Sequence, residues 1–418
     1  DGLGGAVVPG TVVVTADGSV GFGADVTAGD GVTVTADNNV VIDANITGDY
    51  DAGNDGDVTI TADADSSGAG DVSMGDFLMM GDDVTVRGYN VQLDAVMADA
   101  ANSTVTTMDG AGVVTVVAEN DATLSDDVRA GLLTGDINVT AGRDTSVEGT
   151  LTAGANTTAD TGNIWIASGG EVTQSAGENM TAGGEVVILG NDGVTLSGTV
   201  GAVNAIGGNV TLGSASGSIT MNDAVSANAS VWATAEEDVI VASGVTVRAD
   251  ANANESGDIV FTADSNVDGD GAVKLATGTG NVSTLQAENI TLIGDDVVAG
   301  ILTADMGAGD GDGDVTVRAA NDATFYGAVT AGNVTGAISI EATEEDVATM
   351  AGATLTAGGN VTVVSGDDST FDAAVTSWNY GISITAGGDV VTTGNAPLSA
   401  VDGLGGAVVP GTVVVTAD

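Results

Sequence analysis

The sequence lacks cysteine and histidine altogether, and it has only 3 prolines and 6 lysines and arginines among its 418 residues. Without cysteine there is no disulfide framework and no thiolate metal site. Without histidine, Ser-His triads and imidazole acid-base catalysis are excluded as well. Whatever chemistry this chain performs therefore depends on carboxylates, hydroxyls and the backbone.

Positive charge is scarce, because 59 aspartates and glutamates give the chain a formal net charge of −53. Nucleic-acid phosphates and anionic membrane surfaces repel such a polyanion, so neither is an expected partner. No apolar run approaches the roughly 18 to 20 residues of a membrane helix. Apolar residues still make up 43% of the chain, which predicts a folded protein rather than an acidic disordered one.

The two ends of the sequence carry the same 17-residue segment. Residues 1–17, DGLGGAVVPGTVVVTAD, recur unchanged 401 positions later as residues 402–418. This identity predicts that residues 1–401 form one unit of a tandem array and that residues 402–418 begin the next unit. A duplicated terminal segment in a finite protein is the alternative. The start at Asp1, without Met or a basic and apolar leader, indicates an excised or processed piece.

An older duplication lies inside the 401-residue unit. Residues 114–141 align without gaps on residues 315–342, with 15 of 28 positions identical. The segment GDVTITAD at 56–63 matches GDIVFTAD at 257–264 with the same displacement. We therefore expect two diverged halves of about 200 residues, roughly 12–209 and 210–412.

A finer period of about 25 residues runs through both halves. It is marked by a five-residue run of apolar-x-apolar-x-small residues, and such alternation predicts a strand because successive side chains point to opposite faces. The runs start at Val12, Val32, Val58, Val84, Val114, Ile137, Ile164, Val186, Val210, Val239, Ile259, Ile290, Val315, Ile338, Val361 and Ile382, and again at Val413. The fifth residue is small in every run, which indicates a tight corner over neighbouring chain.

Polar turns and shorter alternating runs fill the rest of each period. Turn formers such as Asp37-Asn38-Asn39 follow the marker run, and a second short run such as 40–44 comes next. Two or three strands fit into 25 residues, whereas a helix hardly does. The sequence therefore predicts an all-β parallel β-helix, or β-solenoid, with about 25 residues per coil and about 16 coils per 401-residue unit. Extra length before the marker runs, as at 48–57, 99–112 and 303–314, predicts a ridge of loops along one edge.

The repeats at 322–340, DATFYGAVTAGNVTGAISI, and at 352–368, GATLTAGGNVTVVSGDD, resemble the repeat regions of bacterial surface adhesins of the filamentous haemagglutinin type. The resemblance covers nearly the whole chain and is compositional and periodic. It implies a right-handed parallel β-helix, export to the cell surface and a fibrous or adhesive role. The chain departs from the family in its far more acidic charge and in lacking the family's amino-terminal secretion domain.

Acidic loops provide the candidate metal ligands. Calcium takes six to eight oxygens from flexible acidic loops, and the densest such loops are at 49–57 and 309–314. The candidate ligands are Asp49, Asp51, Asp55, Asp57, Asp310, Asp312 and Asp314, with a smaller pair at Asp268 and Asp270. Their spacing fits neither an EF-hand nor the nonapeptide calcium repeat, so solvated turns are the alternative. No cofactor is required, and Ca²⁺ is the only candidate.

Acidic turns that recur in every coil would stack carboxylates in a column. Unit charges about 4.8 Å apart in water repel by roughly 0.9 kcal/mol before screening by salt. We therefore expect a diffuse atmosphere of solution cations and a saline exterior. The motif Asn-x-Ser/Thr also recurs, partly because a turn Asn often precedes a V-T or I-T strand. The candidate glycosylation sites are Asn45, Asn102, Asn156, Asn179, Asn228 and Asn254.

Two other functions fit the sequence less well. A polysaccharide-active enzyme would combine carboxylates with basic residues in one cleft, whereas here the six cations are scattered over distant coils. Arg87 and Arg318 occupy outward positions of their runs and are expected to be solvated. Ice binding would need a continuous array of T-x-T pairs such as 33–35 and 59–61, and bulky or charged residues interrupt it. Exposed Trp165, Ile240 and Ile293 instead suggest a lateral contact patch.

These observations favour a structural, non-enzymatic protein: an extracellular filament of head-to-tail β-solenoid units with a polyanionic surface. The expected partners are further copies of itself, along the fibre axis and laterally, together with solution cations. The alternative is the stalk of a cell-surface adhesin whose binding tip lies outside this chain. Neither end of the chain offers a polar cap, and both lie in the same strand register, which favours continuation.

Overall fold

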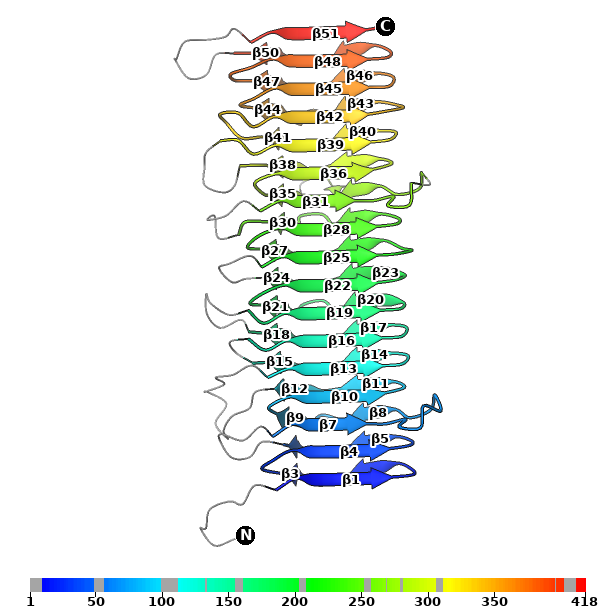
Figure 1. Ribbon diagram of the computed structural model, residues 1–418. Helices are drawn as coiled ribbons and strands as arrows, with labels where there is room; N and C mark the ends of the chain where they lie inside the picture. Colours follow the sequence, from blue (N-terminus) through cyan, green and yellow to red (C-terminus); the bar gives the residue numbers. More distant parts are fainter. Residues whose placement is uncertain are drawn as a thin grey trace. The chain divides into compact units, whose positions relative to one another are not determined.

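The computed structural model describes residues 10–48, 56–98, 112–131, 134–154, 161–202, 208–251, 257–267, 269–278, 281–305, 311–394, 396–401 and 411–418. The chain divides into two units, Asp1–Gly208 and Asn209–Asp418, which are described separately as unit 1 and unit 2. Within the described residues every regular element is a β-strand (Figure 1). No helix in these residues is long and apolar enough to cross a membrane.

Unit 1 is a β-solenoid of three parallel sheets, and each coil gives one strand to each sheet (Figure 1). Sheet A contains β1 (Val12–Ala16), β4 (Val32–Ala36), β7 (Val58–Thr61), β10 (Val84–Gly88), β13 (Val114–Ala118), β16 (Ile137–Ala141), β19 (Ile164–Ser168) and β22 (Val186–Gly190). Sheet B contains β2 (Val20–Phe22), β5 (Val40–Ile42), β8 (Val72–Met74), β11 (Val91–Leu93), β14 (Ala122–Leu124), β17 (Thr145–Val147), β20 (Glu171–Gln174) and β23 (Gly193–Leu196). Sheet C contains β3 (Val26–Thr27), β6 (Ile46–Thr47), β9 (Leu78–Gly81), β12 (Ala95–Ala98), β15 (Val128–Ala130), β18 (Leu151–Ala153), β21 (Met180–Ala182) and β24 (Val200–Ala202).

Unit 2 has the same three sheets. Its sheet A contains β25 (Val210–Ser214), β28 (Val231–Ala235), β31 (Ile259–Thr262), β36 (Ile290–Gly294), β39 (Val315–Ala319), β42 (Ile338–Ala342), β45 (Val361–Ser365), β48 (Ile382–Ala386) and β51 (Val413–Ala417). Its sheet B contains β26 (Ile219–Met221), β29 (Val239–Val241), β32 (Val273–Leu275), β37 (Val297–Ala299), β40 (Ala323–Phe325), β43 (Val347–Thr349), β46 (Ser369–Phe371) and β49 (Val390–Thr392). Its sheet C contains β27 (Val225–Ala227), β30 (Thr246–Arg248), β35 (Thr284–Gln286), β38 (Ile301–Thr303), β41 (Val329–Thr330), β44 (Leu355–Ala357), β47 (Val375–Ser377) and β50 (Leu398–Ala400). A small antiparallel pair, β33 (Thr277–Gly278) and β34 (Asn281–Val282), lies outside these sheets.

Residues at the same place in successive coils pair with one another. In unit 1, Val12 of β1 lies opposite Val32 of β4, and Val32 lies opposite Val58 of β7. In unit 2, Ile382 of β48 lies opposite Val413 of β51. This in-register pairing stacks the inward apolar residues on one another, whereas the outward rows are mixed, as where Asn138 lies opposite Trp165 and Arg318 opposite Glu341. The predicted all-β solenoid is confirmed.

The alternation within each strand separates a dry core from a polar surface. In β4 the side chains of Val32, Val34 and Ala36 are fully buried, whereas Thr33 and Thr35 are partly exposed. The largest fully buried side chains include Phe261, Phe325 and Phe371 of unit 2. Burial of these apolar rows is the main force holding each coil on its neighbours, since no disulfide is available.

One of the predicted marker runs was assigned to the wrong sheet. Val239 begins β29 of sheet B, and the sheet A strand of that coil is β28, which starts at Val231. Both segments, VWATA at 231–235 and VIVAS at 239–243, fit the apolar-x-apolar-x-small pattern. Side chains alternate with period two in every sheet, so the pattern alone does not say which sheet a strand joins.

Extra chain is inserted at three corners rather than one, and the pair β33–β34 lies at one of them, between the sheet B strand β32 and the sheet C strand β35. Several insertions lie between a sheet C strand and the next sheet A strand, as predicted, and most of their residues are outside the described part. Two others, 63–70 in unit 1 and 264–271 in unit 2, follow the sheet A strands β7 and β31. Both start at an aspartate with left-handed backbone, Asp63 with φ 54° and Asp264 with φ 52°.

Glycine closes each of these two loops. A Cβ on Gly70 would lie 2.1 Å from the Asp63 backbone nitrogen, and one on Gly271 would lie 2.2 Å from that of Asp264. Only a residue without Cβ can approach the start of the loop so closely. The loop can therefore leave the coil and return to it at the same point, and the stack continues undisturbed below and above.

Candidate functional site

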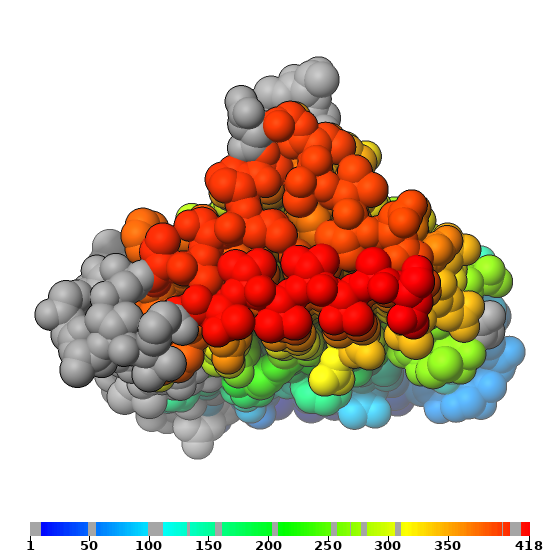
Figure 2. Space-filling view, turned by 90° about the horizontal axis from the view of Figure 1, so that it is seen from above, coloured from blue at the N-terminus to red at the C-terminus, as the bar shows by residue number. Residues whose placement is uncertain are grey.

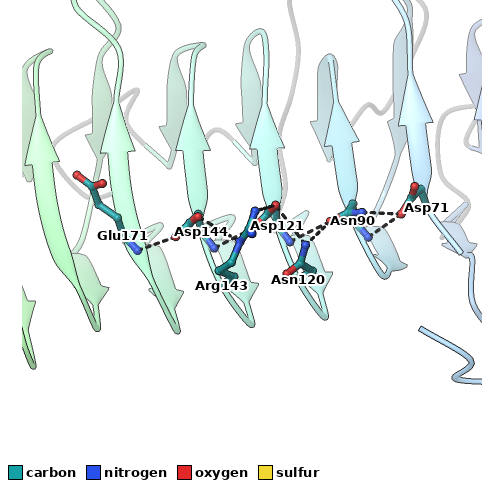
Figure 3. A network of polar contacts seen from close by, with 7 residues as sticks. All are labelled: Asp71, Asn90, Asn120, Asp121, Arg143, Asp144 and Glu171. Carbon is teal, nitrogen blue, oxygen red and sulfur yellow. Dashed lines mark hydrogen bonds and ion pairs between the residues drawn. The ribbon is translucent and has the colours of Figure 1, made fainter. Parts of the chain in front are cut away.

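A ladder of short polar side chains crosses the turns that precede the sheet B strands of unit 1 (Figure 3). In the five successive coils of β5, β8, β11, β14 and β17, the side-chain Oδ1 of an Asp or Asn accepts a hydrogen bond from the backbone N–H of the equivalent residue one coil later. The N–O distances are 2.9 Å from Asp71 to Asn39, 3.1 Å from Asn90 to Asp71, 3.3 Å from Asp121 to Asn90, 3.3 Å from Asp144 to Asp121 and 3.0 Å from Glu171 to Asp144. We call Asn39, Asp71, Asn90, Asp121 and Asp144 the unit 1 ladder.

The corresponding turns before β37 to β49 of unit 2 carry the same hydrogen bonds with aspartate in every place, whereas the earlier turns of this unit include Ser218 and Ala272. The N–O distances are 3.2 Å from Asp322 to Asp296, 3.0 Å from Asp346 to Asp322, 2.8 Å from Asp368 to Asp346 and 2.7 Å from Asp389 to Asp368. We call Asp296, Asp322, Asp346, Asp368 and Asp389 the unit 2 ladder. The predicted stacking of acidic turns into a column is confirmed here.

These ladders form because the turn residue just before a strand has a backbone N–H that the sheet does not use. Asp and Asn side chains are short enough to accept a hydrogen bond from nearby backbone and favour turns for that reason. Sequence reasoning predicted the column but missed the hydrogen bond. The available signal was an Asp or Asn directly before the second strand in successive coils, as at Asp322, Asp346 and Asp368.

One cationic side chain pairs with the unit 1 ladder. Arg143 donates from Nε to Asp121 Oδ1 at 2.7 Å, pairs with Asp121 Oδ2 through its second nitrogen, and lies 3.2 Å from Asp144 Oδ2 (Figure 3). This guanidinium lowers the pKa of Asp121 below its ordinary value. Among the described residues, no lysine or arginine forms an ion pair with the unit 2 ladder, although Lys274 pairs with Asp238 two coils before Asp296.

Two other carboxyl groups show the opposite shift. Burial raises the pKa of Asp94 in unit 1, and the charges of Asp126 and Asp76 raise it further. Burial also raises the pKa of Asp295, next to the unit 2 ladder, and Asp296 is the largest of several charges that add to the effect. Burial and neighbouring negative charges therefore oppose the ionisation of these two carboxyl groups.

A carboxylate in the inserted loop of unit 1 is held differently. Asp63 Oδ1 accepts from Ser67 N at 2.7 Å and from Ser67 Oγ at 2.9 Å, and Oδ2 accepts from Gly68 N at 2.9 Å. Burial raises the pKa of Asp63, but these hydrogen bonds outweigh it, and the net shift is downward. Asp63 is thus a cap that closes its own loop.

The turns before the sheet A strands contain a second set of ladders, and two of the predicted metal ligands belong to it. Asp57 Oδ1 accepts from Asp83 N at 3.2 Å, and Asp83 Oδ1 accepts from Val113 N at 2.8 Å. In unit 2, Asp314 accepts from Ala337 N at 2.7 Å and donates its own N–H to Asn289. Both carboxylates therefore join successive coils.

The structure shows less about the other predicted metal ligands. Asp312 and Asp270 are exposed, while Asp49, Asp51, Asp55, Asp268 and Asp310 lie outside the described residues. No group of three or more acidic residues in the described part is arranged to hold a metal ion. The calcium prediction for these loops stays a prediction.

The candidate glycosylation sites differ in accessibility. Asn45 and Asn179 are exposed, and Asn45 accepts from Leu78 N at 3.0 Å as a ladder residue. Asn228 is only 5% exposed, so a glycan on it would require the coil to open. Asn102, Asn156 and Asn254 lie outside the described residues.

Outward side chains on the sheets are mostly uncharged. Arg87 and Arg318 are exposed on sheet A, as predicted. Trp165 is 47% exposed on the same sheet in unit 1. The proposed lateral patch of Trp165, Ile240 and Ile293 is wrong in one member, because Ile240 lies on β29 of sheet B and not on sheet A.

The unit 1 ladder borders a shallow depression of about 340 Å³ lined by Asp71, Val72, Ser73, Asn90, Val91, Gln92, Asn120, Asp121 and Thr123. Its polar groups are carboxylates, amides and hydroxyls, which suit the binding of cations and of hydrogen-bonding ligands.

Comparison with protein-family models, with curated proteins and with solved structures gave no match. The resemblance to filamentous haemagglutinin-type repeats therefore rests on the sequence pattern, and the solenoid fold rests on the structure.

Proposed function

We propose that this chain is a structural module of an extracellular filament, built by head-to-tail continuation of β-solenoid coils. One observation carries the proposal. The segment that repeats residues 1–17 begins a further coil, because β51 pairs with β48 residue for residue, as β1 pairs with β4. A solenoid whose last strand has the sequence of its first is suited to repetition.

The polyanionic surface supports an exterior location in salt. Acidic ladders at the corners and a net charge of −53 keep neighbouring filaments apart and depend on solution cations for screening. In this proposal the cations form a diffuse atmosphere. Excess EDTA at fixed ionic strength should then leave the melting temperature unchanged, whereas a clear fall would indicate a specifically bound divalent ion.

Electron microscopy of the purified chain tests the filament. We expect uniform fibres with an axial repeat of about 77 Å, which is 16 coils at roughly 4.8 Å each. A chain that stays monomeric by analytical ultracentrifugation at every concentration and salt level would contradict the proposal.

The adhesin-like repeats, such as 322–340, favour a second candidate, the stalk of a cell-surface adhesin. The same images distinguish it, since a stalk would appear as a short rod ending in a distinct head. A non-catalytic role belongs to both candidates. The check is to incubate the protein with a panel of acidic and neutral polysaccharides and to measure their length. None of the polysaccharides should become shorter.

A further inference from the structure

Sheet A of unit 2 presents a broad face with no net charge. Its strands are four or five residues long, against two or three in sheets B and C, and β51 lies along the long straight side of the last coil (Figure 2). The outward side chains are the second and fourth of each strand. Among those of the described sheet A strands of unit 2, only Arg318 and Glu341 are charged. Because the whole chain has a net charge of −53, this face can approach a second copy with far less repulsion than the acidic corners.

The two charged residues are neighbours without a partner of their own. Arg318 of β39 lies opposite Glu341 of β42, and both side chains are exposed. Among the described residues, neither takes part in an ion pair. A second copy facing this one in the opposite direction would satisfy both charges, because its Glu341 would meet Arg318 and its Arg318 would meet Glu341.

The row that contains this pair has the same chemistry when read in either direction. It consists of the fourth residues of six successive sheet A strands, from β31 to β48: Thr262, Ile293, Arg318, Glu341, Val364 and Thr385. About its midpoint, a cation is matched by an anion, an isoleucine by a valine and a threonine by a threonine. Such a row is complementary to an antiparallel copy of itself.

The neighbouring row of second residues follows nearly the same symmetry. From β31 to β48 it contains Val260, Thr291, Thr316, Ser339, Thr362 and Ser383. About the same midpoint, hydroxyl faces hydroxyl in the four central strands. One strand further out, Trp232 of β28, which is 39% exposed, would face Val414 of β51. The apolar side chains of the two rows therefore meet one another and not charges.

Other alignments of two such faces match poorly. With the two-fold axis on β39, Arg318 would face Arg318 of the second copy, and Glu341 would face Ile293. In a parallel arrangement, second residues lie opposite fourth residues, so Arg318 would face Thr316 and both charges would stay unpaired. Only the midpoint between β39 and β42 pairs both charges, which gives one alignment an advantage over the others.

We propose that sheet A of unit 2 docks on the same face of a second copy, with the two chains antiparallel and a two-fold axis between β39 and β42. The eight strands from β28 to β51 cover about 34 Å by 17 Å, so both copies together bury roughly 1,100 Å². This area is near the low end for specific interfaces, and the dimer is therefore weak and reversible. The contact joins faces, so it is independent of head-to-tail continuation. In a filament it would hold two rods side by side, and repeated contacts would add avidity.

Arg318→Glu tests the charge pairing by sedimentation equilibrium. It creates two like-charge contacts across the interface, so dimerisation should weaken by about 10²-fold or more. Arg87→Glu is the matched control, because it changes the net charge equally at an exposed arginine on sheet A of unit 1. The control should leave dimerisation unchanged. Equal weakening by both variants would show general repulsion between chains and overturn the proposal.

Glu341→Arg separates pairing from net charge. It makes the chain less negative, so general repulsion predicts stronger association, whereas the docked pair predicts weakening similar to that of Arg318→Glu. In a mixture of the two variants, each introduced charge faces an opposite one. We expect this mixture to dimerise about as well as the unmodified protein. Two variants that stay monomeric when mixed would overturn the antiparallel alignment, provided that circular dichroism shows both to be folded.

Single cysteines measure the orientation, and the chain has no cysteine of its own. In the docked pair, Thr262→Cys of one copy faces Thr385→Cys of the other across the roughly 10 Å between packed sheets. Two copies of Thr262→Cys would be about 26 Å apart, since five strand spacings separate β31 from β48. A short bismaleimide should link the mixture and leave Thr262→Cys alone unlinked. Linking of Thr262→Cys with itself would show parallel chains and overturn the proposal.

The docking face and the filament can fail separately. Fibres that never lie in pairs by electron microscopy, for the unmodified chain as for Arg318→Glu, would keep the filament and end the docking face. Dimers that disappear with Arg318→Glu, without any longer species, would support the docking face and contradict the filament. A chain that is monomeric at every concentration tested would end both proposals.

Discussion

The two ladders at the sheet B corner have the same hydrogen-bond geometry and different charge. In unit 1, two of the five members are asparagine, and Arg143 pairs with Asp121 and Asp144. In unit 2 all five members are aspartate, and no described lysine or arginine pairs with them. The comparison teaches that the hydrogen bond between successive turns needs the side-chain oxygen and not its charge. The charge then decides how much each ladder depends on solution ions.

Removing the oxygen should weaken both ladders. Asp346→Ala leaves the Asp368 N–H without its acceptor, and we expect a loss of about 1 kcal/mol in stability. Asp121→Ala should cost more, because it also releases Arg143. Native-state hydrogen exchange by mass spectrometry measures both as faster exchange in the following coil. Unchanged hydrogen-exchange protection after Asp346→Ala would show that the Asp346 oxygen does not stabilise the following coil. The two ladders would then not share the same stabilising hydrogen bond.

Removing only the charge should have opposite effects on the stability of the two units. Asp346→Asn keeps the acceptor and relieves repulsion from Asp322 and Asp368, so we expect a gain of about 0.5 kcal/mol. Asp121→Asn keeps the acceptor but loses the pairing with Arg143, so we expect a loss smaller than that of Asp121→Ala. The same exchange experiment gives the sign of each change. Changes of equal sign would mean that charge plays the same part in both ladders.

Acidification should also change the stability of the two units in opposite directions, near Asp121 in unit 1 and near Asp295 in unit 2. The pKa of Asp121 is lowered, so its contribution is present above the ordinary value of 3.8 and is lost as pH falls through the lowered pKa. The pKa of Asp295 is raised, so its ionisation destabilises unit 2 above that pKa, and the penalty fades as pH falls toward 3.8. Exchange protection around Asp295 should therefore rise first on acidification. Asp295→Asn is the control and should abolish this rise.

A change in salt concentration should give the smallest difference in amide exchange between the two ladders. The Debye length falls from about 30 Å at 0.01 M to about 3 Å at 1 M, which screens repulsion between exposed carboxylates. We expect slower exchange at the amides of Asp322, Asp346 and Asp368 in high salt. The amides of Asn90 and Asp121 should change less, since their ladder already contains a cation and two amides. Intrinsic exchange rates from unstructured peptides correct for the direct effect of salt on the chemistry.

The sequence predicted the solenoid because its two-residue alternation and 25-residue period are both direct consequences of the fold. It misplaced Val239 because sheets A and B alternate in the same way, and only the length of the coil distinguishes β28 from β29. It missed the insertions after β7 and β31, since a closing glycine such as Gly70 is one of 65 in the chain. Of the candidate site, it predicted the stacked carboxylates but not that their oxygens accept backbone N–H groups, because a residue pattern does not reveal which amides a sheet leaves unused.

In-register stacking also bears on how such a chain folds. Sheet A pairs join residues only 20 to 31 positions apart along the chain, as between Val12 and Val32 and between Ile259 and Ile290. Adding coils lengthens the protein without increasing that separation, so the entropy of closing each loop stays constant as the chain grows. Folding can then begin at any coil and propagate in both directions, and gain or loss of whole coils during evolution leaves every remaining interface intact.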